Sequence, residues 1–237
     1  MRRSGGFSLL ECLVGMALSF LVVLACLEFF GAARRSYSRL KDREETAQGA
    51  AAALDKMSVD ILRAGQGLVR AAALGLVEPV AESGGALRVT RAEAEFALTA
   101  DVLAGDTRLP LVRTAELARG REICLEDGAK GEVLTVASVE PGAVIFSSPL
   151  SHDYARDGTS VLLLERITLS LDARQGVLRR KVNLSSAQPL LENVRSAEFL
   201  EDRPANLVRV RFSLAPQGDA TYELCLFPKN PALVGKN

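Results

Sequence analysis

The 237-residue sequence has no tryptophan, one histidine and only 5% aromatic residues. Its four cysteines are scattered, whereas zinc sites draw cysteine and histidine ligands in clusters, so no metal site is expected. The 29 Lys and Arg residues equal the 29 Asp and Glu residues, so the chain lacks the basic surplus of a general nucleic-acid binder. No metal, cofactor or nucleic-acid partner is therefore predicted.

Patterns typical of enzymes are also missing. The sequence contains no glycine-rich phosphate loop and no identifiable glycosidase-like pair of carboxylates. Ser151, His152 and Asp153 are adjacent, but a catalytic triad is defined by geometry across the fold, and neighbours on a turn rarely align in that way. His152 is interpreted as a turn residue, and the chain is not predicted to be an enzyme.

What the sequence does contain is a long apolar segment near its N-terminus. Residues 12–27 carry no charge, and apolar residues continue after Glu28 until Arg34. As a helix rising about 1.5 Å per residue, residues 7–27 reach roughly 30 Å, the thickness of the hydrocarbon core of a bilayer. This segment is predicted to span a membrane once.

Three kinds of N-terminal signal share this appearance. An ordinary secretory signal has a shorter apolar region followed by small residues at a cleavage site, a place that residues 31–33 could fill. A lipoprotein signal has its cysteine at the end of the apolar stretch, whereas Cys12 lies near the beginning. The third kind is a short basic leader placed directly before the apolar helix, and residues 1–6 fit it.

Gly6, Phe7 and Glu11 match the third kind position by position. Together they resemble the class III signal of type IV prepilins and type II secretion pseudopilins. The resemblance implies that a prepilin peptidase cuts between Gly6 and Phe7 and methylates the new N-terminal amine. Because this cleavage precedes the apolar helix, the helix would stay in the mature protein.

Glu11 is an acidic residue inside the apolar helix. A carboxylate in hydrocarbon costs about 2.5 to 3.5 kcal/mol on insertion scales, so one that is retained there normally has a partner. The resemblance implies that the partner is the N-terminal amine of a neighbouring subunit, and that the pair brings subunits into register during assembly. The alternative is that Glu11 lies among the lipid headgroups and is solvated.

The resemblance also implies a location and a set of partners. The partners would be prepilin peptidase, other minor pilins, the major pilin and the pilus assembly platform. The chain would cross the inner membrane once, with a periplasmic C-terminal domain, before it enters a pilus at the cell surface. The flanking Lys and Arg residues, two before the span and five soon after it, favour the opposite orientation, and the expected topology follows the resemblance.

Beyond the span, the periodicity remains helical to about residue 64. Gly65 and Gly67 then supply a stop. Residues 7–33 are predicted to form the transmembrane and assembly helix, and residues 34–66 its amphipathic continuation. The apolar or small positions that recur at spacings of three and four are Ala47, Ala50, Leu54, Met57, Ile61 and Ala64.

Residues 67–237 are predicted to form a periplasmic, β-rich globular domain. From about residue 85, apolar and polar residues alternate and turn residues recur every 8 to 12 positions, which is typical of antiparallel sheet. The expected fold is α+β and pilin-like, with the long helix packed on an antiparallel sheet and a small β-subdomain inserted at about residues 100–150. The strands predicted individually are 122–126, 132–139, 143–147, 208–214, 222–226 and the hairpin 160–172 with 177–183.

The cysteines divide by compartment. Cys12 and Cys26 lie in the apolar helix and are interpreted as small apolar residues. Cys124 and Cys225 lie in the expected periplasmic domain and are a candidate disulfide, which would close a loop of about 100 residues and stabilise the fold by roughly 2 to 4 kcal/mol. The sequence leaves open whether these two residues are bonded.

Several segments resemble PilW-type minor pilins and, more loosely, the J-type pseudopilins of type II secretion. Residues 54–65 resemble the helix end of the former, and residues 147–154, 176–180 and 189–194 with 198–199 follow in the same order. The implied function is that of a minor pilin in type IV pilus assembly or initiation, within a tip complex. The alternatives are a J-type pseudopilin of the periplasmic pseudopilus and a secreted binding domain with an ordinary signal peptide.

Overall fold

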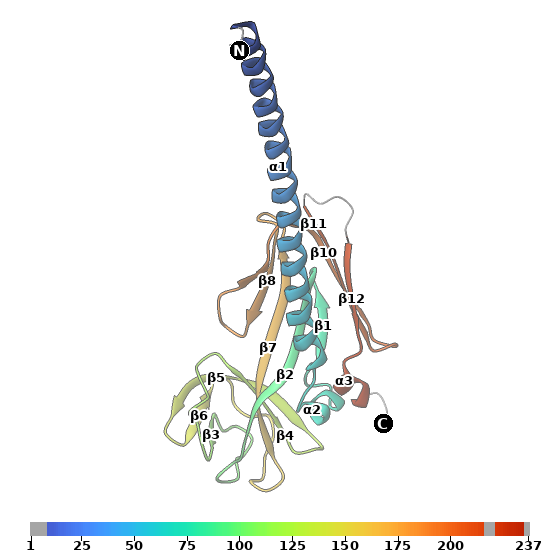
Figure 1. Cartoon of the computed structure of the whole chain (residues 1–237). Coiled ribbons are helices and arrows are strands. Elements are labelled where there is room, and N and C mark those ends of the chain that lie inside the picture. The colour runs from blue at the N-terminus through green and yellow to red at the C-terminus, as the bar shows by residue number, and fades with distance from the viewer. Residues whose placement is uncertain (1–8, 216–220, 235–237) are drawn as a thin grey trace, which may run out of the picture. The chain divides into compact units, whose positions relative to one another are not determined.

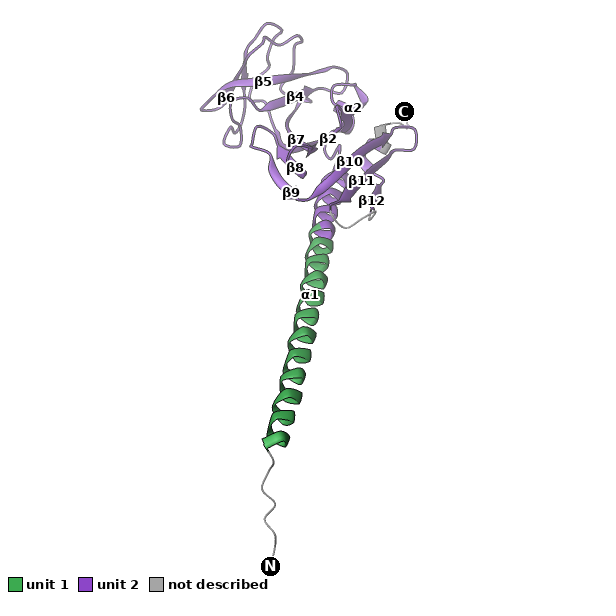
Figure 2. Ribbon diagram, turned by 90° about the horizontal axis from the view of Figure 1, so that it is seen from above, with its two compact units in different colours: residues 1–49 green, residues 50–237 purple. Residues whose placement is uncertain are grey.

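The structure, a computed structural model, describes residues 9–215 and 221–234. The chain divides into two compact units, Met1–Gly49 and Ala50–Asn237 (Figure 2). The helices are α1 (Leu9–Leu62), α2 (Val69–Ala73) and α3 (Lys229–Val234).

Helix α1 confirms the expected long N-terminal helix (Figure 1). It extends over 54 residues. The first proline in the sequence is Pro79, so nothing in α1 removes a backbone donor or clashes with the preceding turn. The helix ends at Leu62, and Gly65 follows with a φ of +70°, a conformation that glycine adopts without steric cost. The predicted glycine stop is confirmed.

Two antiparallel sheets make up most of the second unit. The larger sheet contains β1 (Val80–Ser83), β2 (Ala86–Phe96), β3 (Arg108–Pro110), β4 (Glu122–Glu126), β5 (Gly131–Glu140), β6 (Ala143–Phe146), β7 (Ser160–Asp172), β8 (Val177–Val182) and β9 (Gln188–Leu191). The smaller sheet contains β10 (Val194–Asp202), β11 (Leu207–Leu214) and β12 (Thr221–Leu226). The predicted hairpin is formed by β7 and β8, and the other strands predicted individually are β4, β5, β6, β11 and β12.

Strand β7 is the point at which the larger sheet branches. Strand β2 pairs with residues 161–170 of β7 and occupies one of its two edges. On the other edge, β4 pairs with residues 160–163 and β8 pairs with residues 167–172. Residues 164–166 of β7 therefore lie at a fork between β4 and β8.

The last turns of α1 supply the helical side of the main core. Ala50, Met57 and Ile61 are completely buried, and Ala53 is 1% exposed. The structure corrects the predicted stripe at Ala47, which is exposed and precedes the first buried position of the helix. The strand residues packed in this cluster include Val89, Ile167 and Leu169 of the larger sheet and Phe199, Val210 and Phe212 of the smaller one. The end of the helix thus packs against both sheets.

Residues 100–150, the expected inserted β-subdomain, contribute to an apolar cluster separate from the main core. Leu109, Ile123 and Val144 are buried there. Strand β4 nevertheless pairs with β7, and β5 pairs with β4. These strands therefore extend the larger sheet, although their side chains pack in an apolar cluster separate from the main core, together with Phe96 of β2 and Leu163 of β7.

Candidate functional site

The first candidate site is the apolar part of α1. Its most apolar stretch of 18 residues has a mean hydropathy of 2.4, and none of that stretch is buried. Leu9, Phe20 and Phe30 are 83%, 63% and 68% exposed. Soluble proteins rarely expose a continuous apolar surface of this size, whereas a hydrocarbon environment accommodates it. By length and composition, α1 can cross a bilayer.

The polar residues of this stretch are placed in ways that a membrane helix tolerates. Glu11 lies in the first described turn of α1. The Ser19 hydroxyl donates to the Gly15 carbonyl at 2.8 Å, so its hydrogen bond is made inside the helix. Gly6 and Phe7, the predicted processing residues, lie outside the described residues. Processing at Gly6 and Phe7 and the assembly role of Glu11 remain predictions.

An ion pair near the C-terminal end of α1 was not predicted. Asp60 is 1% exposed, and Arg180 of β8 binds it with both arms of the guanidinium. The Arg180 Nε–Asp60 Oδ2 distance is 2.6 Å and the Nη2–Oδ1 distance is 3.0 Å. These hydrogen bonds raise the pKa of Arg180 above its usual value. The sequence did hold a sign that Asp60 is buried, because this residue is next to Ile61 and three residues after Met57, on the apolar face of the helix.

The candidate disulfide between Cys124 and Cys225 is not formed in the structure, where both residues are free. Cys124, on β4 of the larger sheet, is completely buried in a cluster with Leu68 and Leu162. Cys225, on β12 of the smaller sheet, is exposed, with its thiol 3.6 Å from Glu223. The two residues belong to different sheets, and their side chains lie in different environments. The sequence could not show that the two cysteines lie in different environments, because both are flanked by glutamate residues on the same strand face.

Residues 151–153 have structural contacts instead of forming a triad. The Ser151 backbone N–H donates to both carboxylate oxygens of Glu132 at 3.0 Å. Asp153 Oδ1 accepts a hydrogen bond from the Ala104 N–H at 2.7 Å. The His152 ring packs edge-on against Tyr154, with the centroids 6.4 Å apart. The Ser151 backbone and the Asp153 carboxylate thus connect this turn to neighbouring segments.

Glu126, at the end of β4, is a buried acid that the sequence reading also missed. It is 5% exposed, and its Oε2 atom has no hydrogen-bond partner within the described residues. Desolvation raises the pKa of Glu126, Arg70 lowers it in part, and Glu95 adds a smaller increase. The alternation of the strand puts Glu126 on the same face as Cys124. Nothing in the sequence, however, indicated that this face of the strand is buried.

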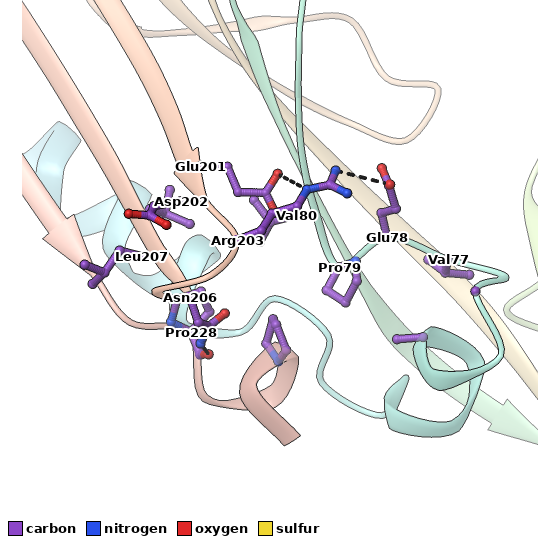
Figure 3. A pocket seen from close by; sticks show the side chains of 14 residues that line it. Val77, Glu78, Pro79, Val80, Glu201, Asp202, Arg203, Asn206, Leu207 and Pro228 are labelled. Atoms are coloured by element: carbon purple, nitrogen blue, oxygen red, sulfur yellow. Dashed lines mark hydrogen bonds and ion pairs between the residues drawn. The ribbon is translucent and has the colours of Figure 1, made fainter. Parts of the chain in front are cut away.

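A cavity of about 360 Å³ opens between the segment before β1 and the β10–β11 turn (Figure 3). Its walls are partly apolar, with Val77, Pro79 and Leu207 among them. Arg203 lies between Glu78 and Glu201, with nitrogen–oxygen distances of 3.2 and 3.3 Å. These polar groups are therefore engaged with one another. No group of three or more potential metal ligands occurs among the residues that the structure describes.

Residues 1–27 match the family model of the prokaryotic N-terminal methylation motif. No curated protein matches the chain. Two phage tailspikes are similar over 31% of this chain and 15% of their own: Gp54 of Acinetobacter baumannii bacteriophage AP22 (15% identity, TM-score 0.28) and gp49 of Pseudomonas phage LKA1 (18% identity, TM-score 0.27). A likeness at this level bears on neither fold nor function.

The methylation motif and the fold agree with each other. The matched residues include the predicted cleavage position and most of the apolar part of α1. The long helix, packed at its C-terminal end on antiparallel sheet, is a pilin-like α+β fold. The chain therefore carries a motif that implies processing by prepilin peptidase, on a fold consistent with the type IV pilin and pseudopilin superfamily.

Proposed function

We propose that this chain is a minor pilin, a structural subunit that enters a type IV pilus after prepilin peptidase has removed residues 1–6 and methylated Phe7. The observation that carries this proposal is the methylation motif over residues 1–27, immediately before and within an apolar helix. In this arrangement, cleavage leaves the helix attached to the β-rich domain. The mature subunit then keeps its membrane anchor.

Each part of the chain has a place in this function. Residues 7–33 hold the subunit in the inner membrane before assembly and pack with neighbouring helices in the filament afterwards. Residues 34–62 continue the helix, and the β-rich part of the chain that follows forms the periplasmic domain. Glu11 binds the N-terminal amine of a neighbouring subunit. The partners are the peptidase, other minor pilins, the major pilin and the assembly platform.

The narrower assignment rests on the ordered resemblance of residues 54–65, 147–154, 176–180 and 189–194 with 198–199 to PilW-type minor pilins. A J-type pseudopilin of type II secretion shares the same anchor and processing, and it is the principal alternative. A tip-complex position belongs to the minor-pilin proposal alone.

Mass spectrometry of the mature N-terminus tests the processing step. We expect a protein that begins at N-methylated Phe7 when the chain is co-expressed with prepilin peptidase. A Gly6→Val variant, in which a bulky side chain replaces the glycine at the cleavage position, should keep residues 1–6. A mature protein that begins near Arg34 would instead identify an ordinary signal peptide and contradict the proposal.

Fractionation of the native host distinguishes a pilus from a secretion system. We expect the subunit in sheared and purified pili, crosslinked to other minor pilins, and we expect deletion of the gene to reduce piliation. Normal pili combined with loss of type II secretion in the deletion strain would assign the chain to the pseudopilus.

A further inference from the structure

A cavity of about 270 Å³ opens at the fork in the larger sheet. It lies where β4 and β8 diverge from the same edge of β7. Its lining combines four cationic side chains with one acidic side chain, although the whole chain has no net charge. The charged side chains are Arg88, Arg121, Arg166, Lys181 and Glu122.

The backbone at the fork is hydrogen-bonded by the cavity's own residues. Asn183 replaces a strand neighbour for Arg166, because its Oδ1 accepts the Arg166 N–H at 2.8 Å and its N–H donates to the Arg166 carbonyl at 2.7 Å. Arg121 Nη2 donates to the Leu164 carbonyl at 3.0 Å. Asn183 and Arg121 therefore satisfy these backbone groups at the fork, and the side chains of Arg88, Arg166 and Lys181 are not needed for that purpose.

Two of the cations already have carboxylate partners. Arg121 pairs with Glu93. Arg166 Nε lies 2.8 Å from Glu122 Oε2, but the contact lacks hydrogen-bond geometry, so this buried N–H donor is unpartnered. Arg121 Nε is likewise buried without a hydrogen-bond partner. Each of these two guanidiniums thus contains a buried donor without a hydrogen-bond partner in the described part of the chain.

The other two cations have no ion-pair partner within the described residues. Arg88 lies opposite Thr168 in the β2–β7 register, and Thr168 lies opposite Lys181 in the β7–β8 register. Directly opposed residues share a sheet face, so the three side chains form one row across three strands. The backbones of Arg88 and Lys181 lie about 10 Å apart, because two strand spacings separate β2 from β8. The Thr168 side chain lies between them. Two long, exposed cationic side chains at this spacing can both reach an anion above Thr168.

We propose that this cavity binds an oxyanion, a phosphate or carboxylate group, between Arg88 and Lys181, with the Thr168 hydroxyl as a further donor. The anion would neutralise the two unpaired cations and accept charge-assisted hydrogen bonds from them. Glu122 is an internal competitor, because it holds Arg166 by an ion contact at the edge of the same cavity. This site is independent of the membrane helix and of the proposed role in pilus assembly.

The test is a chemical-shift titration of the ¹⁵N-labelled full chain in non-ionic detergent, at constant ionic strength adjusted with sodium chloride. Sodium phosphate and sodium acetate are titrated separately as the two probes. We expect saturable shifts at the amides of Arg88, Thr168 and Lys181 with at least one probe. Absence of saturable shifts with both probes would overturn the proposal.

The decisive variant is Arg88→Ala combined with Lys181→Ala, which should weaken binding roughly tenfold or more. The matched control is Arg156→Ala combined with Arg174→Ala, which removes the same charge from exposed residues outside the cavity and should leave binding unchanged. Equal weakening in the two double variants would show non-specific attraction and refute the site. Lys181→Glu alone provides a second disrupting variant, and unfolding midpoints verify that each protein is folded.

Glu122→Gln gives a prediction of opposite sign. Without the carboxylate, Arg166 is free to turn toward the ligand, so binding should become tighter. Weaker binding by a folded Glu122→Gln protein would contradict the assignment of Glu122 as a competitor. A merely structural role for the arginine cluster would predict loss of stability with no gain in affinity.

Discussion

Asp60 of α1 and Arg180 of β8, separated by 120 positions in the sequence, form a two-pronged ion pair at the edge of the main core. Asp60 lies on the same helix face as Met57 and Ile61, which pack among the strands. Because the carboxylate is 1% exposed, the helix cannot rotate about its axis without leaving a buried charge unpaired. The pair therefore fixes which face of residues 50–62 meets the sheets.

Removal of the Asp60 charge should strongly destabilise the fold. We expect Asp60→Asn to lower the free energy of unfolding by about 3 kcal/mol, because Arg180 would remain partly buried without its counterion. The measurement is urea unfolding of the full chain in detergent, followed by circular dichroism. The control is Glu140→Gln, which breaks the exposed pair with Arg108 and should cost less than about 1 kcal/mol.

Replacing both Asp60 and Arg180 distinguishes two contributions to the free energy of unfolding. One is the destabilisation caused by an unpaired buried charge, and the other is the net stabilisation by the ion pair itself. Asp60→Leu combined with Arg180→Met replaces both ionic groups by apolar ones, so it should be less destabilising than Asp60→Asn. A double variant as unstable as the single one would show that the pair itself contributes most of the energy.

Glu126 should make the protein less stable as the pH rises through the acidic range. Burial raises the pKa of Glu126 in the folded state, so between its unfolded and folded values the folded state binds more protons. The stability that protonated Glu126 contributes is fully present below the pKa that Glu126 has in the unfolded chain. It is lost as the pH rises through the higher pKa that Glu126 has in the folded protein. Glu126→Gln, which remains neutral, should therefore raise the unfolding midpoint at pH 7 and flatten this dependence above about pH 4.5.

The control for this experiment is Glu192→Gln, which changes the same charge at an exposed position. It should alter neither the midpoint at pH 7 nor its slope with pH. A Glu126→Gln protein less stable than the parent at pH 7 would mean that the carboxylate has a charged partner in the fold that outweighs its burial.

The two thiols of the β-rich part of the chain, Cys124 and Cys225, should differ sharply in reactivity. Burial, with a smaller effect of Glu126, raises the pKa of Cys124 to about 12, and the reactive species is the thiolate. Cys225 is exposed on β12. We expect iodoacetamide to label Cys225 in the native protein and Cys124 only after unfolding, as measured by peptide mass spectrometry. A crosslinked peptide pair containing both cysteines would contradict this arrangement.

Glu11 should matter for assembly and not for membrane insertion. We expect Glu11→Ala to remain in the membrane fraction, because the apolar stretch around it is unchanged or more apolar. Its amount in purified pili should fall strongly, because the proposed partner of the neighbouring amine is gone. Glu28→Ala removes the other acid of the segment and should assemble normally. Glu11→Ala pili with the parental subunit content would rule out the charge-pairing role.

Much of the secondary structure could be predicted because it depends on neighbours in the sequence. The period of the apolar stripe and the glycines after it located the end of α1. Alternation and turn residues located β4, β7 and β8 to within a residue. Details of packing were harder: Ala53 is buried although it was not in the predicted stripe, and Ala47 is exposed although it was.

The sequence by itself determined the apolar helix, its preceding methylation motif and the alternating strands, because each follows from residues close together in the chain. The tertiary structure alone decided that Asp60 meets Arg180, that Cys124 and Cys225 belong to different sheets, and that Arg88, Thr168 and Lys181 form one row. These relationships depend on strand order and register, which bring together residues far apart in the sequence. A shift of one residue in either register would place a different side chain on each face.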